Sequence, residues 1–498
     1  MSMRRIVLAG LTLLVVLLSV GPALFGSLEQ QQIAGRLELY QADLMLQARE
    51  LSLETDSVTQ LRQALMGESL EGPIEAYQTA REQTASPIDA PATSRDEFPS
   101  STALAVDPTA QPFLDRLDLR LGLLQAEAGN LAEARDRWQT ISGDGELTQT
   151  AQVLLGLWGE SPTLLPDAEG QIQRSLQGWF QIQALEQLYE LQQRSDALSQ
   201  LNATTQVLAQ QSALKLGLLG IGPALGGIVG VGLLAFLGIQ RLIQGKTALL
   251  AQTNQQRWTT PWTWEITWQV LIVGFFFVGQ IVLPLVLVLA RGLILGPLVG
   301  SATAGGRVAA ASTLVAYLLL AASSIAVLYA SIKPYFPLPE GWFKLQTTSR
   351  WPLWGLGGYF AAVPLVIGVS VVNQQLWQGR GGSNPLLQIV LDETDPVALG
   401  LFFFTAAIAA PVFEEILFRG FLLPSLTRYM AVWPAIALSA FIFAAAHLSV
   451  SEILPLMVLG IVLGFVYTRS RSLLAPMLVH SLWNSATMLG LFILGSVE

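Results

Sequence analysis

The sequence contains no cysteine, only two histidines, His447 and His480, and no lysine before Lys215. Without cysteine the chain can form neither a disulfide nor a thiolate metal site. Charged residues make up only 13% of the 498 residues, hydrophobic residues make up 52%, and the mean hydropathy is +0.50. This composition indicates a polytopic membrane protein. The net charge of -9 argues against a nucleic-acid partner.

The N-terminus begins with a basic and apolar segment. Arg4 and Arg5 precede an apolar run from Ile6 to about Gly26 that has no good small-residue cleavage site. We therefore expect residues 1–27 to be an uncleaved membrane anchor. Because the arginines are expected to stay in the cytoplasm, residues 28–211 are predicted to be extracytoplasmic.

Residues 212–498 return to the membrane. Apolar runs of about 20 residues predict eight further spans, near 214–240, 266–290, 309–331, 354–373, 397–421, 433–449, 453–468 and 473–495. The predicted fold is all-α: an eight-span helical bundle, an N-terminal anchor helix and a helical soluble domain. Basic residues follow the second, fourth, sixth and eighth spans, which predicts an external C-terminus after the ninth span.

The soluble region is acidic and helical in pattern. Residues 29–66 have helical periodicity, whereas 72–111, rich in Pro, Ser, Thr, Ala and Asp, is predicted to be a linker. A possible tetratricopeptide repeat follows, because small and aromatic residues take the positions typical of it; they are Leu121-Gly122, Gly129-Asn130, Ala134 and Trp138, with a weaker copy around Leu185, Leu188, Ala197 and Leu201. Any amphipathic helical hairpin with alanine at the crossing would look similar, so both interpretations stay open. Either one predicts a surface for protein partners.

The most informative stretch is 410–420, where Glu414, Glu415 and Arg419 lie within a run of apolar residues. Each ionisable side chain at membrane depth costs about 2.5–3.5 kcal/mol, so three together indicate a function. Glu415 and Arg419 are four residues apart on one helix face and can form a buried ion pair. Glu414 lies about 100° further round the helix, where the arginine cannot easily reach it. We therefore predict that Glu414 is the free carboxylate.

Both histidines follow this stretch, each in an apolar segment and each with a companion four residues away. Phe443 and His447 share one helix face, and so do His480 and Asn484. A single buried histidine is more often a satisfied core residue than a catalyst. Two histidines in the same membrane region as an unpaired carboxylate instead indicate a functional site.

The three motifs together resemble a known family. Glu-Glu-x-x-x-Arg, Phe-x-x-x-His and His-x-x-x-Asn, in this order and each in its own predicted span, look like the motifs of the CPBP intramembrane proteases, the CAAX prenyl endopeptidase and bacteriocin-processing (ABI) family. The resemblance covers about the last hundred residues and, more loosely, the spans before them. It implies an endopeptidase, surrounded by lipid, that hydrolyses a peptide bond of a membrane-associated protein.

The resemblance also implies a role for each motif residue. Glu414 and His447 would position and deprotonate a water molecule. His480 and Asn484 would hydrogen-bond the oxyanion that forms when this water attacks a peptide carbonyl. The supporting residues would be Glu415, Arg419 and Phe443.

A divalent metal is a second possibility. Glu414, His447 and His480 match a catalytic zinc site by ligand type, although the chain has no His-Glu-x-x-His motif. The family resemblance is compatible with both a metalloprotease and a glutamic protease. Both mechanisms therefore stay open at this point.

Two readings from other classes compete with an enzyme. A transporter could use buried Glu, Arg and His as a proton relay, but the sequence shows no internal repeat between its halves. A membrane scaffold could recruit partners through residues 28–211, with the buried polar cluster serving only to hold helices together. Loss of activity without loss of partner binding, on an isosteric change at Glu414, would separate the enzyme from the scaffold.

Overall fold

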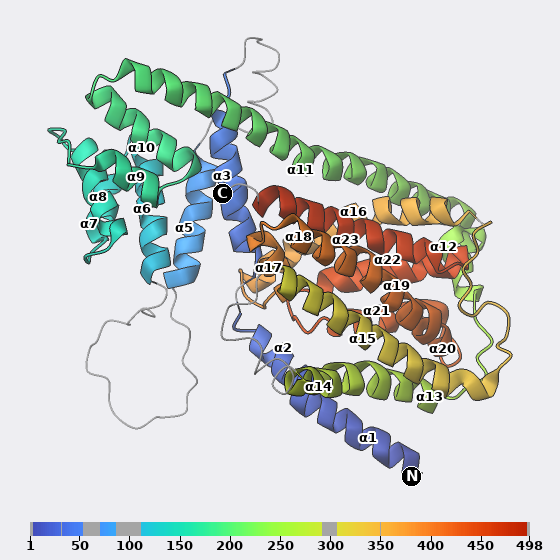
Figure 1. The fold of residues 1–498 in the computed structure, drawn as a ribbon. Coiled ribbons are helices and arrows are strands. Elements are labelled where there is room, and N and C mark those ends of the chain that lie inside the picture. Colours follow the sequence, from blue (N-terminus) through green and yellow to red (C-terminus); the bar gives the residue numbers. More distant parts are fainter. Residues whose placement is uncertain are drawn as a thin grey trace, which may run out of the picture. The chain divides into compact units, whose positions relative to one another are not determined.

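The computed structural model describes residues 3–30, 32–52, 70–85, 111–290, 306–348 and 350–495. Every regular element in these ranges is a helix, which confirms the predicted all-α fold. The chain divides into two compact units, residues 1–32 with 221–492 and residues 33–220 with 493–498. We call them the membrane unit and the helical unit; both are drawn in Figure 1. The sequence-based boundaries lie after residues 27 and 211.

The membrane unit is built from long apolar helices. Its N-terminal helix comprises α1 (Met3–Val15), the π-helical turn η1 (Val16–Val20) and α2 (Gly21–Ser27). Its other helices are the later part of α11 (Ser195–Gln244), α12 (Leu249–Gln252), α13 (Trp264–Gln269), η4 (Val270–Val282), α14 (Leu283–Ala290), α15 (Gly306–Ile332), α16 (Trp351–Trp377), α17 (Pro385–Asp392), α18 (Pro396–Phe404), η7 (Thr405–Ala409), α19 (Ala410–Glu414), η8 (Glu415–Leu422), α20 (Leu423–Leu426), α21 (Val432–Ala445), α22 (Ile453–Ser470) and α23 (Leu474–Gly495), together with short 3-10 turns.

Eight helices of the described chain are long and apolar enough to cross a membrane, so the chain is an integral multi-pass membrane protein. The sequence predicts nine such segments. The difference is the segment 433–449, where helix α21 has 14 residues. At about 1.5 Å per residue it is roughly 21 Å long, shorter than the ~30 Å hydrocarbon core of a bilayer. The helix ends at Ala445, and Leu448 just beyond it adopts a left-handed backbone conformation with φ 60°.

Small residues let α22 approach α21 closely. A Cβ atom added to Gly460 would lie 2.8 Å from the Cβ of Ala440, and one added to Gly464 would lie 2.9 Å from Ile436. Close backbone approach at glycine and alanine is the usual way in which membrane helices pack. Since Gly460 has no side chain, its carbonyl oxygen is open to a donor on η8.

The helical unit contains α3 (Ala34–Arg49), α5 (Glu71–Ala85), α6 (Gln111–Glu127), α7 (Leu131–Thr140), α8 (Glu146–Leu157), α9 (Ala168–Ser175), α10 (Gly178–Leu191) and the first part of α11. Helices α6 and α7 form the hairpin expected from the sequence. Gly129 makes the turn with φ 84°, which glycine adopts without strain. The indole of Trp138 donates to the Leu119 carbonyl at 3.2 Å and fills the space where a Cβ on Gly122 would stand. Membership of the tetratricopeptide repeat class stays a prediction.

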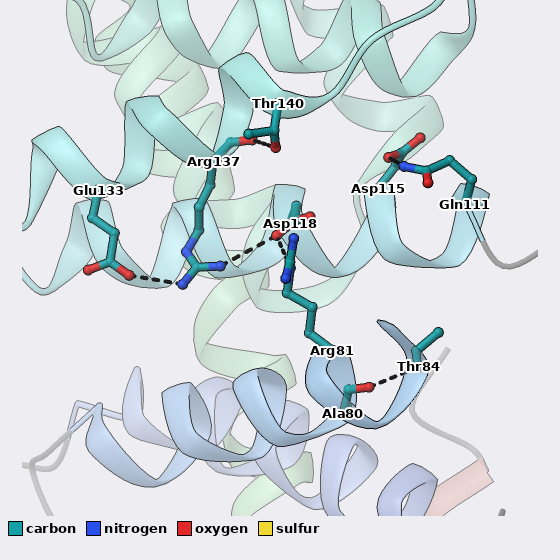
Figure 2. Close-up of polar contacts among 9 residues, drawn as sticks. All are labelled: Ala80, Arg81, Thr84, Gln111, Asp115, Asp118, Glu133, Arg137 and Thr140. Atoms are coloured by element: carbon teal, nitrogen blue, oxygen red, sulfur yellow. Dashed lines mark hydrogen bonds and ion pairs between the residues drawn. The ribbon is translucent and has the colours of Figure 1, made fainter. Parts of the chain in front are cut away.

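A buried carboxylate joins three helices of this unit. Asp118 on α6 accepts hydrogen bonds from Nε of Arg81 on α5 at 2.6 Å and from Nη1 of Arg137 on α7 at 3.4 Å (Figure 2). Arg137 also donates to Glu133 at 2.9 Å on the exposed side of α7. Burial of a carboxylate is costly unless it is paired, so these contacts favour one arrangement of α5, α6 and α7.

The predicted linker over 72–111 is wrong in its first part. Helix α5 covers 71–85, with Tyr77 and Ala80 buried, while 86–110 lies outside the described residues. Pro73 stands in the first turn of α5, where a missing backbone N–H costs little, and Glu, Ala and Gln continue the helix. The Pro and Ser residues that suggest a linker lie mainly after residue 85, so the predicted linker begins too early in the chain. For the predicted helix at 29–66, the structure describes α3 and leaves 53–69 undescribed.

Helix α11 is a single helix of 50 residues, whereas the sequence suggests a soluble hairpin helix and a separate span. Its length is about 75 Å, more than twice what a membrane span requires. Neither glycine nor proline interrupts residues 195–216, so nothing in the sequence stops the helix between its polar and apolar parts.

Candidate active site

The predicted site residues come from α19, η8, α21, the turn after α21, and α23 of the membrane unit. Glu414 ends α19, and Glu415 begins the π-helical segment η8, which also carries Arg419. Phe443 lies on α21, and His447 lies in the turn after it. The other two residues, His480 and Asn484, are on α23. π-Helical turns within helices are rare and are frequent at functional sites.

Glu415 and Arg419 form the ion pair expected from their spacing. Nη1 of Arg419 donates to Oε1 of Glu415 at 2.9 Å, and both side chains are at most 1% exposed. Nη2 of Arg419 donates to the Gly460 carbonyl at 3.2 Å, and the guanidinium lies 4.4 Å from the centre of the Phe443 ring. The arginine is thus held by charge, by a backbone acceptor and by an aromatic face.

His480 is fixed by the same carboxylate. Its Nδ1 lies 2.9 Å from Oε1 of Glu415, and the ring meets Phe443 edge to face at 5.7 Å. Because an ionised carboxylate only accepts hydrogen bonds, Nδ1 carries the proton in this contact. In a ring that carries only this proton Nε2 is an acceptor, and it lies 3.9 Å from Oε2 of Glu414.

Glu414 differs from its neighbour in its surroundings. Its side chain is 14% exposed, compared with 0% for Glu415. Oε1 accepts a hydrogen bond from the hydroxyl of Tyr317 at 2.9 Å, and Oε2 is buried without a hydrogen-bond partner among the described residues. The sequence predicts Glu414 as the free carboxylate. In the structure one of its oxygens accepts a hydrogen bond, and the other lies near His480 without a hydrogen-bond partner among the described residues.

His447 is not paired with Glu414 in the part of the chain that the structure describes. Its Nδ1 lies 2.9 Å from the Phe443 carbonyl, and its ring meets the Phe443 ring at 5.0 Å. The nearby Glu452, just before α22, accepts from the Asn384 backbone N–H at 2.7 Å. Burial raises the pKa of Glu452, while that hydrogen bond and the interaction with His447 oppose the rise.

Asn484 is one helical turn from His480, as its spacing predicts. Its Nδ2 donates to the Ala406 carbonyl in η7 at 2.7 Å. A side-chain amide has two N–H donors, so this contact uses one of them.

The side chains expected as alternative metal ligands are Glu414, His447 and His480. Among the described residues no group of three or more His, Asp or Glu is placed to hold a metal ion. Nδ1 is engaged in both imidazoles, by Glu415 in His480 and by the Phe443 carbonyl in His447. Such contacts are usual for the second ring nitrogen of a metal-bound histidine and do not exclude a zinc ion. A metal cofactor at Glu414, His447 and His480 stays a prediction.

Two contributors to the site were not predicted. Tyr317 is 97 residues from Glu414 in the sequence, on α15, and belongs to no motif. Gly460 contributes only its carbonyl oxygen. In the sequence, a tyrosine inside a span is only a weak indication of a functional site. A backbone carbonyl acceptor cannot be recognised from the sequence.

Comparisons with known proteins cover the segment that contains these residues. Residues 396–486 match the family model described as type II CAAX prenyl endopeptidase Rce1-like. A stretch of 133 residues, 27% of this chain, is 26% identical to "Putative membrane peptidase YdiL" of Bacillus subtilis (strain 168). The chain spans about half the length of that relative, 53%. No solved structure matches. All seven predicted site residues lie within the matched segment, 396–486.

Proposed function

We propose that the membrane unit is an intramembrane endopeptidase that hydrolyses a peptide bond of a membrane-associated protein. The observation that carries the proposal is the facing pair of acceptors, Oε2 of Glu414 and Nε2 of His480, 3.9 Å apart. The Rce1-like match supports it, because it contains both residues.

A water molecule is the chemical group that this pair would hold best. It could donate one hydrogen bond to Oε2 of Glu414 and one to Nε2 of His480, and both acceptors would then be satisfied. Its lone pair would remain available for a peptide carbonyl. The aromatic rings of Phe413, Phe418 and Phe443 are buried. An apolar environment of this kind strengthens electrostatic interactions.

Hydrolysis then follows general acid–base chemistry. The water oxygen bonds to the carbonyl carbon, and Glu414 takes the water proton. The same carboxylic acid returns the proton to the amide nitrogen as the carbon–nitrogen bond breaks. Within this scheme His480 orients the water, because an oxyanion contact from Nε2 would require a second proton on its ring. By family resemblance, His447 assists Glu414.

Asn484 is the candidate donor to the oxyanion through its second amide N–H. We expect Asn484→Ala to lower kcat by roughly 10²- to 10³-fold, as the loss of one oxyanion donor does. Loss of the contact with Ala406 should cost only about 1 kcal/mol of stability. Thr487→Ala on the exposed side of the same helix is the matched control for turnover and melting temperature. A wild-type kcat in Asn484→Ala would remove this role.

The proposal is tested by reconstituting the purified chain in proteoliposomes with a library of membrane-anchored peptides. New peptide termini, identified by mass spectrometry, are expected with the wild type and should be lost with His480→Asn. A folded protein that generates no new terminus from the library would contradict the peptidase and favour the membrane scaffold.

The helical unit has an accessory role in this proposal. None of the predicted catalytic residues belongs to it, and its acidic helices suit the recruitment of a protein substrate or partner. Arg4 and Arg5 precede the first span, so the unit is assigned to the extracytoplasmic side.

This sidedness predicts the outcome of protease treatment of sealed, right-side-out vesicles. The protease should remove residues 33–211 and leave fragments of the membrane unit. Digestion after addition of detergent is the control for accessibility of the cleavage sites. Full protection of the helical unit in sealed vesicles, with cleavage only in detergent, would contradict this topology and place the unit on the cytoplasmic side.

A further inference from the structure

A tyrosine outside the Rce1-like segment contacts the proposed base. Tyr317 lies on α15, whereas the family match begins at residue 396. Its hydroxyl donates to Oε1 of Glu414 at 2.9 Å, and its ring meets Phe413 edge to face at 6.1 Å. The phenol is thus fixed at both ends, by packing against α19 and by the carboxylate.

The contact decides which oxygen of Glu414 is available. A carboxylate on a flexible side chain can rotate, and its two oxygens are equivalent until a neighbour distinguishes them. With Oε1 occupied by Tyr317, only Oε2 remains, and this is the oxygen that faces His480. Arg419 does not serve this purpose, because it donates hydrogen bonds to Glu415 and to the Gly460 carbonyl.

We propose that Tyr317 is a positioning residue, which holds Glu414 with Oε2 turned toward Nε2 of His480. The inference rests on the proposed peptidase function and deepens it, because it adds a helix outside the family-matched segment to the active site. Preorganisation of this kind raises kcat, since the oriented base is needed in the transition state and contributes little to substrate binding.

Tyr317→Phe removes the hydroxyl and keeps the ring against Phe413. We expect kcat to fall by about 10- to 100-fold, with KM and the melting temperature close to wild type. Tyr329→Phe is the matched control, because Tyr329 lies on the same helix with a 51% exposed side chain. Its kcat should be unchanged.

A double-mutant cycle separates positioning from a general structural effect. In single-turnover assays with excess enzyme, Tyr317→Phe should change the residual rate of Glu414→Gln by less than about 3-fold, since no base remains to be oriented. A full 10- to 100-fold loss in that background would overturn the inference. So would a wild-type kcat for Tyr317→Phe, or a loss of kcat matched by a fall in melting temperature.

The outcomes distinguish a failure of the role of Tyr317 from a failure of the proposed peptidase function. An active wild type, an inactive Glu414→Gln and a fully active Tyr317→Phe would reject the role of Tyr317 alone. A wild type without peptidase activity, or a fully active Glu414→Gln, would reject the proposed function and this inference with it.

Discussion

Glu414→Gln is expected to lower kcat by about 10²- to 10⁴-fold while the protein keeps its fold, because the change removes a general base and preserves its volume. The amide oxygen of glutamine can still accept the hydrogen bond from Tyr317, which Glu414 accepts at 2.9 Å. A neutral amide cannot take a proton from water. The loss should therefore appear in kcat and scarcely in the melting temperature.

The control for this result is Glu340→Gln, a change of the same chemistry at an exposed position. It should leave both kcat and melting temperature unchanged. Full activity of Glu414→Gln would remove Glu414 from the mechanism.

Glu415→Gln is expected to affect stability as much as rate. It would leave the guanidinium of Arg419 buried and without a counter-charge, which typically costs 3 to 5 kcal/mol, an order-of-magnitude figure. The same change weakens the contact that fixes His480, since Nδ1 lies 2.9 Å from Glu415. We therefore expect a lower yield in detergent and a lower melting temperature, measured beside Glu414→Gln.

The double variant Glu415→Gln with Arg419→Gln tests whether the unpaired charge of Arg419 causes the loss of stability in Glu415→Gln. Without either charge, the penalty for an unpaired buried ion disappears, so the melting temperature should recover in part. Identical behaviour of the Glu414 and Glu415 variants in rate and stability would contradict the unequal roles assigned to them.

Local spacing was enough to predict the buried ion pair of the candidate site. The Glu415–Arg419 pair follows from residues four apart on one helical face, and the structure has it at 2.9 Å. The distinct position of Glu414 follows from the same helical geometry. These predictions succeed because both partners lie on one element, where the sequence fixes the distance.

Contacts between helices were beyond the reach of the sequence. The bond of His480 to Glu415 spans 65 residues, and the bond of Tyr317 to Glu414 spans 97. Spacing within one helix places His480 beside Asn484 but says nothing about which carboxylate the ring will meet. The same limit applies to His447: its spacing places it beside Phe443, and the structure has its Nδ1 2.9 Å from the Phe443 carbonyl.

The fold, like the site, was predictable from the sequence only in part. Hydrophobic runs identify the membrane helices, because the apolar content is a property of each segment. The length of α21 and the continuity of α11 depend on where helices end. Helix ends are set by caps, turns and neighbouring helices, so hydropathy alone predicts them poorly.

Peptide hydrolysis by water at Glu414 is tested most directly by cleavage in H₂¹⁸O. Purified wild-type protein in proteoliposomes should produce new C-terminal carboxylates that carry ¹⁸O after a single turnover, and Glu414→Gln should produce almost none of them. Absence of new termini with folded wild-type protein, or equal amounts of labelled termini from both proteins, would contradict the account.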